Sequence, residues 1–131
     1  MKTIGKPVVL LVAMTVMGCS NKKQTSDVLV KANQIHLETA GIHQRLEKQL
    51  DSARAVTTNP VYRRSLDSLS NLVELWENAM LEVPGFEHAH NSNDAHHHHN
   101  TAPAMTDESM LEYQQNAYMA IVELEKSFTG L

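Results

Sequence analysis

The chain has 131 residues, and its 15 acidic residues outnumber its 11 basic ones, which gives a formal net charge of −4. This acidic balance argues against nucleic acid as a partner, because binding to phosphates depends on clustered Lys and Arg. Cys19 is the only cysteine. It cannot form a disulfide within the chain, and it leaves a metal site elsewhere in the chain without thiolate ligands.

The N-terminal segment has the pattern of a secretory signal. Lys2 and Lys6 precede an apolar run over residues 8–17. That run is shorter than the roughly 20 residues needed to span a bilayer, and it has the length and flanks of a signal-peptide core. The following Val16-Met17-Gly18-Cys19 resembles a bacterial lipobox, in which the cysteine is lipidated and becomes the mature N-terminus. An ordinary signal peptide with an incidental cysteine is the alternative.

The lipobox predicts how the protein is located in the cell. We expect a lipoprotein signal peptide over 1–18, a lipidated Cys19 and a polar tether through residue 26. The membrane would then be a partner through the lipid anchor. Where bacteria sort lipoproteins by the residue after the cysteine, Ser20 favours an outer-membrane lipoprotein of the cell envelope. The sequence does not indicate which face of that membrane the domain occupies.

The remaining chain predicts an all-α domain over 27–131. Apolar residues recur at alternating spacings of three and four, which is typical of helices with one buried face. The helices are expected at 27–54, 60–83 and 107–128. Ser26 or Asp27, Asn59 followed by Pro60, and Thr106 are the expected N-terminal caps.

The connections suggest how the helices are arranged. The first connection is short, so the first two helices should be antiparallel neighbours in a three-helix bundle. The second connection, 84–105, is long for a compact domain and is therefore a candidate functional loop. The broad apolar face of the second helix predicts that it lies at the centre of the core. Gly41 interrupts the first helix, and close packing of a neighbour is one reason for a glycine there. A bundle of this size has a modest core, so pairing into a homodimer is an open alternative.

The long loop carries the strongest chemical signal in the chain. Neutral imidazole is the commonest metal ligand among side chains and suits Zn, Cu and Ni. His-rich tracts therefore indicate metal binding by composition, and we predict a Cu or Zn ion as cofactor. A solvated linker that merely tolerates histidine and an inserted purification tag are the alternatives. The predicted ligands are His88, His90, His96, His97, His98 and His99.

The first helix offers a second candidate metal site. His36, His43 and Glu47 recur at i, i+7 and i+11. They therefore lie within about 40° of one another around the helix, at the edge of the buried stripe. His43 and Glu47 are one turn apart and could share an ion. Interface histidines that are hydrogen-bonded across the bundle are the alternative.

Several short segments resemble a group of small helical lipoproteins of Bacteroidota. They are the lipobox, Ile35–Ala40, Leu75–Met80 and a closing helix around Met110 to Leu124. The resemblance covers most of the chain. It implies a helical fold and an envelope location, but it implies no specific activity.

These patterns lead to two hypotheses of function. The first is a lipid-anchored envelope protein that binds Cu or Zn through its His-rich loop for buffering, capture or transfer. The second is a structural or interaction lipoprotein whose bundle docks an envelope partner, with the histidines incidental. No enzyme is predicted, because the sequence contains no nucleophile motif, phosphate-binding glycine loop or catalytic cysteine.

Overall fold

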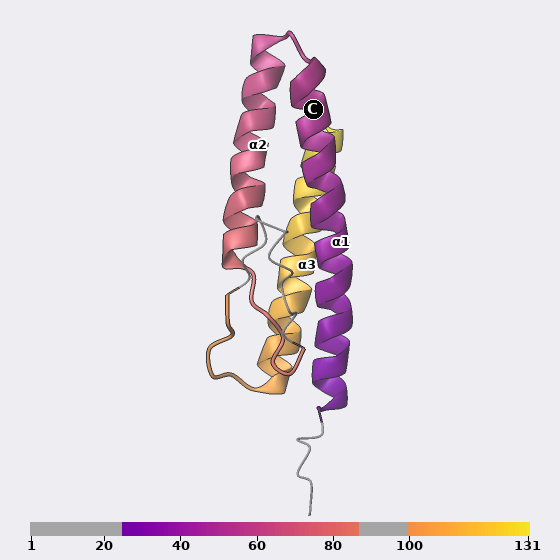
Figure 1. The fold of residues 1–131 in the computed structure, drawn as a ribbon, viewed down its shortest axis with the longest axis vertical. Helices are drawn as coiled ribbons and strands as arrows, with labels where there is room; N and C mark the ends of the chain where they lie inside the picture. The colour runs from indigo at the N-terminus through magenta and orange to yellow at the C-terminus, as the bar shows by residue number, and fades with distance from the viewer. Residues whose placement is uncertain (1–24, 87–99) are drawn as a thin grey trace, which may run out of the picture.

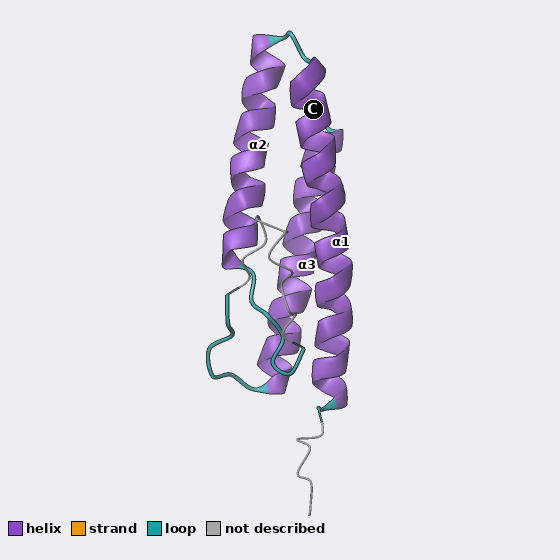
Figure 2. Ribbon diagram, in the orientation of Figure 1, coloured by secondary structure: helices purple, strands orange, loops and turns teal. Residues whose placement is uncertain are grey.

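A computed structural model describes residues 25–86 and 100–131 of the chain. The prediction of an all-α protein with three helices is confirmed: α1 spans Asp27–Val56, α2 spans Pro60–Ala79 and α3 spans Asp107–Thr129. Figure 2 shows that helices and loops make up the described chain. No helix among the described residues is long and apolar enough to cross a membrane.

Each helix begins at the cap that the sequence predicts. The side chains of Ser26 and Thr106 accept hydrogen bonds from backbone N–H groups in the first turns of α1 and α3. Asn59 does the same for α2, with Pro60 at the first helical position. The Ser26 hydroxyl also donates to the carboxylate of Asp107, which joins the starts of α1 and α3. These caps satisfy N–H groups that have no partner within their own helix.

Helix α2 ends at Ala79, four residues before the predicted end, so the predicted boundary at 83 is wrong. Met80 adopts an extended conformation instead. Its carbonyl accepts from the N–H of Asn100, and the N–H of Glu82 donates to the Asn100 carbonyl. The chain therefore exchanges helical hydrogen bonds for a short pairing with Asn100. The apolar spacing in the sequence continues past the end of the helix, because Met80 and Val83 are buried although both lie outside it.

The three helices lie side by side along one long axis. In Figure 1, α1 and α3 begin at the same end and run in the same direction, whereas α2 runs in the opposite direction. The α1–α3 interface is the most extensive of the three. The prediction that the second helix forms the centre of the core is therefore wrong, because α1 supplies more of the buried residues.

The interior consists of two apolar clusters separated by polar residues. The first cluster is centred on Leu46, Leu66 and Ile121 and joins all three helices. The second lies towards the starts of α1 and α3 and contains Ala32, Val83 and Met110. Three buried polar side chains lie between the clusters along the helices, His36 and Thr39 of α1 and Gln114 of α3, and a fourth, His43, follows Ile42 of the first cluster.

Gly41 is not explained by close packing. A Cβ atom built at this position would approach only the Nη1 atom of Arg45, at 3.9 Å. Gly85 differs, because its φ of 85° lies in the left-handed region that favours glycine. The two glycines are therefore a matched pair for testing the backbone argument.

We expect Gly41→Ala to raise the free energy of unfolding by about 0.5–1 kcal/mol, because alanine loses less backbone entropy in a helix and meets no obstacle. Gly85→Ala should lower it by about 1–2 kcal/mol, because an L-residue is strained at positive φ. Chemical denaturation followed by circular dichroism measures both. Destabilisation by Gly41→Ala would contradict the absence of a close neighbour.

Candidate metal centre

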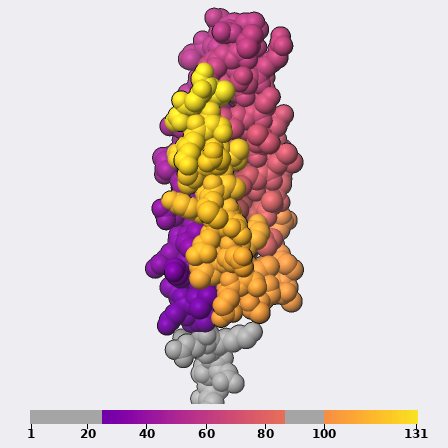
Figure 3. Space-filling model, turned by 180° about the vertical axis from the view of Figure 1, so that it is seen from behind, coloured from indigo at the N-terminus to yellow at the C-terminus, as the bar shows by residue number. Residues whose placement is uncertain are grey.

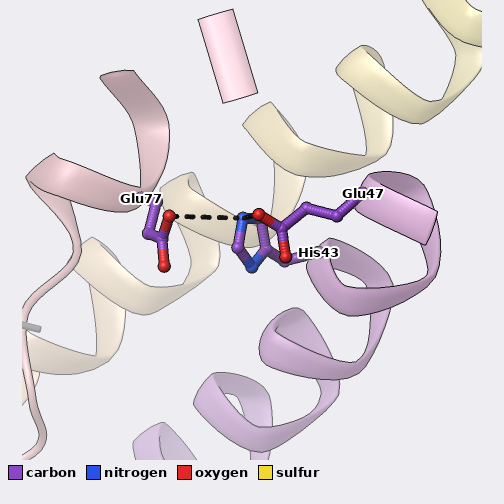
Figure 4. A group of neighbouring side chains, drawn as sticks. All are labelled: His43, Glu47 and Glu77. Atoms are coloured by element: carbon purple, nitrogen blue, oxygen red, sulfur yellow. Dashed lines mark ion pairs between the residues drawn. The ribbon is translucent and has the colours of Figure 1, made fainter. Parts of the chain in front are cut away.

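Three side chains from two helices converge beside the first apolar cluster. His43 and Glu47 are one turn apart on α1, and Glu77 comes from the last turn of α2. The Nε2 atom of His43 lies 3.6 Å from Oε1 of Glu47 and 3.9 Å from Oε2 of Glu77. One potential ligand atom from each residue lies within 4.8 Å of the others. Figure 4 shows the imidazole between the two carboxylates.

Local packing determines where these side chains point. The neighbours Ile42 and Leu46 are buried in the first cluster, which holds His43 on the inner side of α1. On α2, the indole N–H of Trp76 donates to the carbonyl of Ala117 in α3 at 3.0 Å. The Trp76 ring also contacts the His43 ring, with a centroid distance of 5.2 Å. Trp76 therefore orients the last turn of α2, from which Glu77 reaches the imidazole.

The centre is buried on one side and open on the other. The side chain of His43 is 4% exposed, that of Glu77 is 13% exposed and that of Glu47 is 38% exposed. Carboxylates from two different helices therefore face one buried imidazole, and the partly exposed Glu47 leaves the group accessible to a cation from solvent.

The spacing of the donor atoms is close to that of a zinc site. Zn–N and Zn–O bonds of about 2.0–2.2 Å place neighbouring ligand atoms of a tetrahedral site roughly 3.3–3.5 Å apart. The observed 3.6 and 3.9 Å are slightly longer. Small rotations of the two glutamate side chains would complete three bonds. Three protein ligands leave the fourth position for water or another ligand, and imidazole with carboxylates suits Zn²⁺ or Cu²⁺.

The structure divides the second predicted site. It brings His43 and Glu47 together, but their third partner is Glu77 instead of His36. Sequence reasoning missed Glu77 because it lies on another helix. The available signal was its position next to Trp76, at the edge of the apolar stripe of α2. Spacing along one helix cannot indicate which residue of a second helix lies opposite.

His36 takes part in a hydrogen-bonded layer inside the bundle. It is 1% exposed, and its Nδ1 atom lies 3.3 Å from Oε1 of Gln114 in α3. The Nε2 atom of Gln114 donates to the carbonyl of Leu81 at 2.9 Å. Because the amide nitrogen of Gln114 donates to Leu81, its Oε1 is the atom that accepts from His36. Nδ1 of His36 therefore carries the proton. This matches the alternative of an interface histidine that is hydrogen-bonded across the bundle.

The other predicted site residues lie outside the described residues: Cys19, His88, His90, His96, His97, His98 and His99. Asn100, the first described residue after the predicted ligands, donates from Nδ2 to the carbonyl of Asn78 at 2.6 Å. Asn78 follows Glu77, so Asn100 lies next to the turn of α2 that carries Glu77.

Comparison of the chain with protein-family models, curated proteins and solved structures finds no match. The functional argument therefore depends on the geometry of the site.

The buried layer gives a prediction for Gln114. We expect Gln114→Met to lower the free energy of unfolding by about 1–3 kcal/mol, because it removes the partner of the Leu81 carbonyl and of Nδ1 of His36. Gln115→Met, the exposed neighbour, is the control and should change stability little. Equal effects of the two substitutions in thermal denaturation would contradict the structural role of the layer.

Proposed function

We propose that this protein binds a divalent transition metal, Zn²⁺ or Cu²⁺, at a centre formed by His43, Glu47 and Glu77. One observation carries the proposal: an imidazole nitrogen and two carboxylate oxygens from two helices converge within 4.8 Å. Two ligands one turn apart on α1, with a third on the helix beside it, give a rigid and preorganised site. Such a site binds metal for buffering, capture or transfer, and the proposal assigns it no reaction.

The His-rich loop over 84–105 is proposed to take part as a second metal-binding element. Its support is compositional, since six histidines occur within residues 88–99. The position of Asn100 beside Asn78 adds a spatial reason, because Asn100 directly follows the tract in the sequence and lies next to the helix turn of Glu77. In this proposal the loop connects α2 and α3 of an antiparallel bundle and collects ions that the bundle centre then holds.

The proposed location is the cell envelope, with lipid on Cys19 and a tether through residue 26. The support is the lipobox-like sequence after a short apolar run. Sorting to the outer membrane and kinship with small helical lipoproteins of Bacteroidota belong to the same proposal.

A second function has a specific observation in its favour. The contacts of His43 with Glu47 and Glu77 would also suit a protonated imidazole that is paired with carboxylates. The bundle would then be a structural or interaction lipoprotein, and no metal would bind. A metal titration separates the two functions, because an ion pair predicts no stoichiometric binding.

Calorimetric titration with Zn²⁺ and Cu²⁺ tests the metal centre. Loss of a group that only supports a metal ligand lowers metal affinity about 10- to 100-fold. Loss of a ligand should cost at least as much, so Glu77→Gln should weaken binding at the centre at least tenfold. Glu74→Gln, an exposed residue on the same helix, is the control and should leave affinity unchanged. Binding should also weaken as the pH falls, because a protonated imidazole cannot ligate a metal.

Deletion of residues 88–99 separates the loop from the centre. If the bundle holds the high-affinity ion, the deletion removes only weaker sites, and Glu77→Gln removes the tight one. If the loop holds it, the deletion abolishes binding, and His36→Ala with His43→Ala has little effect. Tight binding that survives both Glu77→Gln and the deletion would rule out both sites, and no binding by the wild type would favour the structural alternative.

Lipidation has its own test, which is independent of metal. In a bacterial host, the wild type should incorporate labelled fatty acid and separate with the membranes. Cys19→Ala should abolish the label and leave an unprocessed precursor, because the thiol that accepts the lipid is gone. Equal labelling of the variant would contradict the assignment.

A further inference from the structure

Helix α2 carries a second row of small and apolar side chains on its outer surface. The row follows positions 61, 65, 68, 72, 75 and 79, with spacings of four and three. Val61, Leu72 and Leu75 are 67%, 51% and 66% exposed. Regular spacing over about five turns is typical of a helix surface that contacts another helix.

The row lacks the charged side chains of an ordinary exposed helix surface. None of its six positions carries a charged residue. Its two serines bond back into their own helix: Ser65 donates to the carbonyl of Val61 at 3.4 Å, and Ser68 donates to that of Arg64 at 2.9 Å. Covering these hydroxyls would therefore leave no donor without a partner.

The row lies on the side of α2 that borders α3. Trp76 and Tyr113 hydrogen-bond across that side, to the carbonyls of Ala117 and Ala79 respectively. Asp67 lies on the opposite side of the α2 helical wheel from these contacts. It accepts a hydrogen bond from Arg54 of α1. Figure 3 shows that α3 lies between α1 and α2 on the back of the molecule. We use the name α2–α3 face for the exposed surface formed by Val61, Leu72, Leu75 and Ala79 of α2 with Ala120 of α3.

We infer that the α2–α3 face binds the same face of a second copy of the chain, about a twofold axis parallel to the bundle. Such a rotation places α2 of one copy on α3 of the other. Within one copy these helices run in opposite directions. Every neighbouring pair in the resulting four-helix assembly then also runs in opposite directions, so the helix dipoles oppose one another. A self-complementary face is what a twofold dimer requires.

The heights of the side chains support this orientation. The hydrogen bond between Trp76 and Ala117 places these residues at the same level. Leu72 lies one turn from Trp76, and Ala120 lies almost one turn from Ala117 in the same direction. Because rotation about the long axis preserves height, Leu72 of one copy meets Ala120 of the other. A large side chain opposite a small one allows two helices to approach closely.

The size of the face predicts a modest affinity. The row from 61 to 79 is about 27 Å long, at 1.5 Å per residue. Two helices about 9 Å apart would bury roughly 1,000 Å² in total, which is at the lower end of specific interfaces. We therefore expect a dissociation constant in the micromolar range. Both copies start at the same end of the dimer, so an anchor to one membrane would raise the local concentration of both.

Analytical ultracentrifugation of residues 20–131, which contain all three helices and both core clusters, tests the dimer. The wild type should associate reversibly, with a mass that rises with concentration. Leu72→Glu should weaken association at least tenfold, because it buries a charge in the interface. Leu37→Glu, at a residue of α1 that is 50% exposed, is the matched control and should associate like the wild type. Circular dichroism verifies that both variants remain helical.

Cysteine cross-linking tests the orientation, because residues 20–131 contain no native cysteine. A mixture of the Leu72→Cys and Ala120→Cys proteins should form disulfide-linked pairs between the two variants. Each variant alone should cross-link poorly, since identical positions lie diagonally apart in the proposed dimer. Efficient cross-linking of Leu72→Cys with itself would overturn the orientation. A wild type that stays monomeric at high micromolar concentration would overturn the dimer and leave the face to a different protein.

Discussion

The buried hydrogen-bonded chain from His36 through Gln114 to Leu81 is the constraint on which the rest of the fold depends. It joins α1, α3 and the extended segment after α2 through two hydrogen bonds in the interior. Apolar contacts tolerate sliding of one helix past another, whereas a buried polar group that loses its partner costs about 1–3 kcal/mol. The chain therefore sets the register of α1 against α3, and it positions the carbonyl that follows the end of α2.

This register determines the geometry of the proposed metal centre. His43 lies about two turns beyond His36 on α1, so its height follows from the position of His36. Glu77 lies in the last turn of α2, just before the segment that Gln114 and Asn100 hold in place. Displacement of that segment would move Glu77 relative to the imidazole. A small buried network thus supports a site to which it contributes no ligand, in the way that supporting groups around metal sites do.

The two outer sides of α2 have different chemistry. Glu77 faces α1 and belongs to the proposed metal centre, whereas Leu72 and Leu75 lie on the side that borders α3 and carry the proposed dimer face. The two proposals therefore depend on separate residues, and a substitution that disrupts one should leave the other intact. Helix α2 buries fewer residues than α1 or α3. A helix with a narrow buried face has more surface available for binding.

The sequence alone determined the number of helices, their starts and most of the buried positions. Caps such as Asn59 with Pro60 act through local hydrogen bonds and dihedral preferences, and apolar spacing reports the buried side of one helix. The pairing of His43 with Glu47 also followed from spacing, since one helical turn separates them. By contrast, the end of α2 was placed too late, because Met80 and Val83 keep an apolar spacing while their backbone pairs with Asn100.

Only the tertiary structure decided which residues of different helices meet. It placed His36 on Gln114 and His43 beside Glu77, although His36 and His43 lie on the same side of α1. The physical reason is that spacing along one helix fixes directions around its own axis. The rotation and height of its neighbours follow from the packing of all three helices and from the satisfaction of the polar groups buried between them.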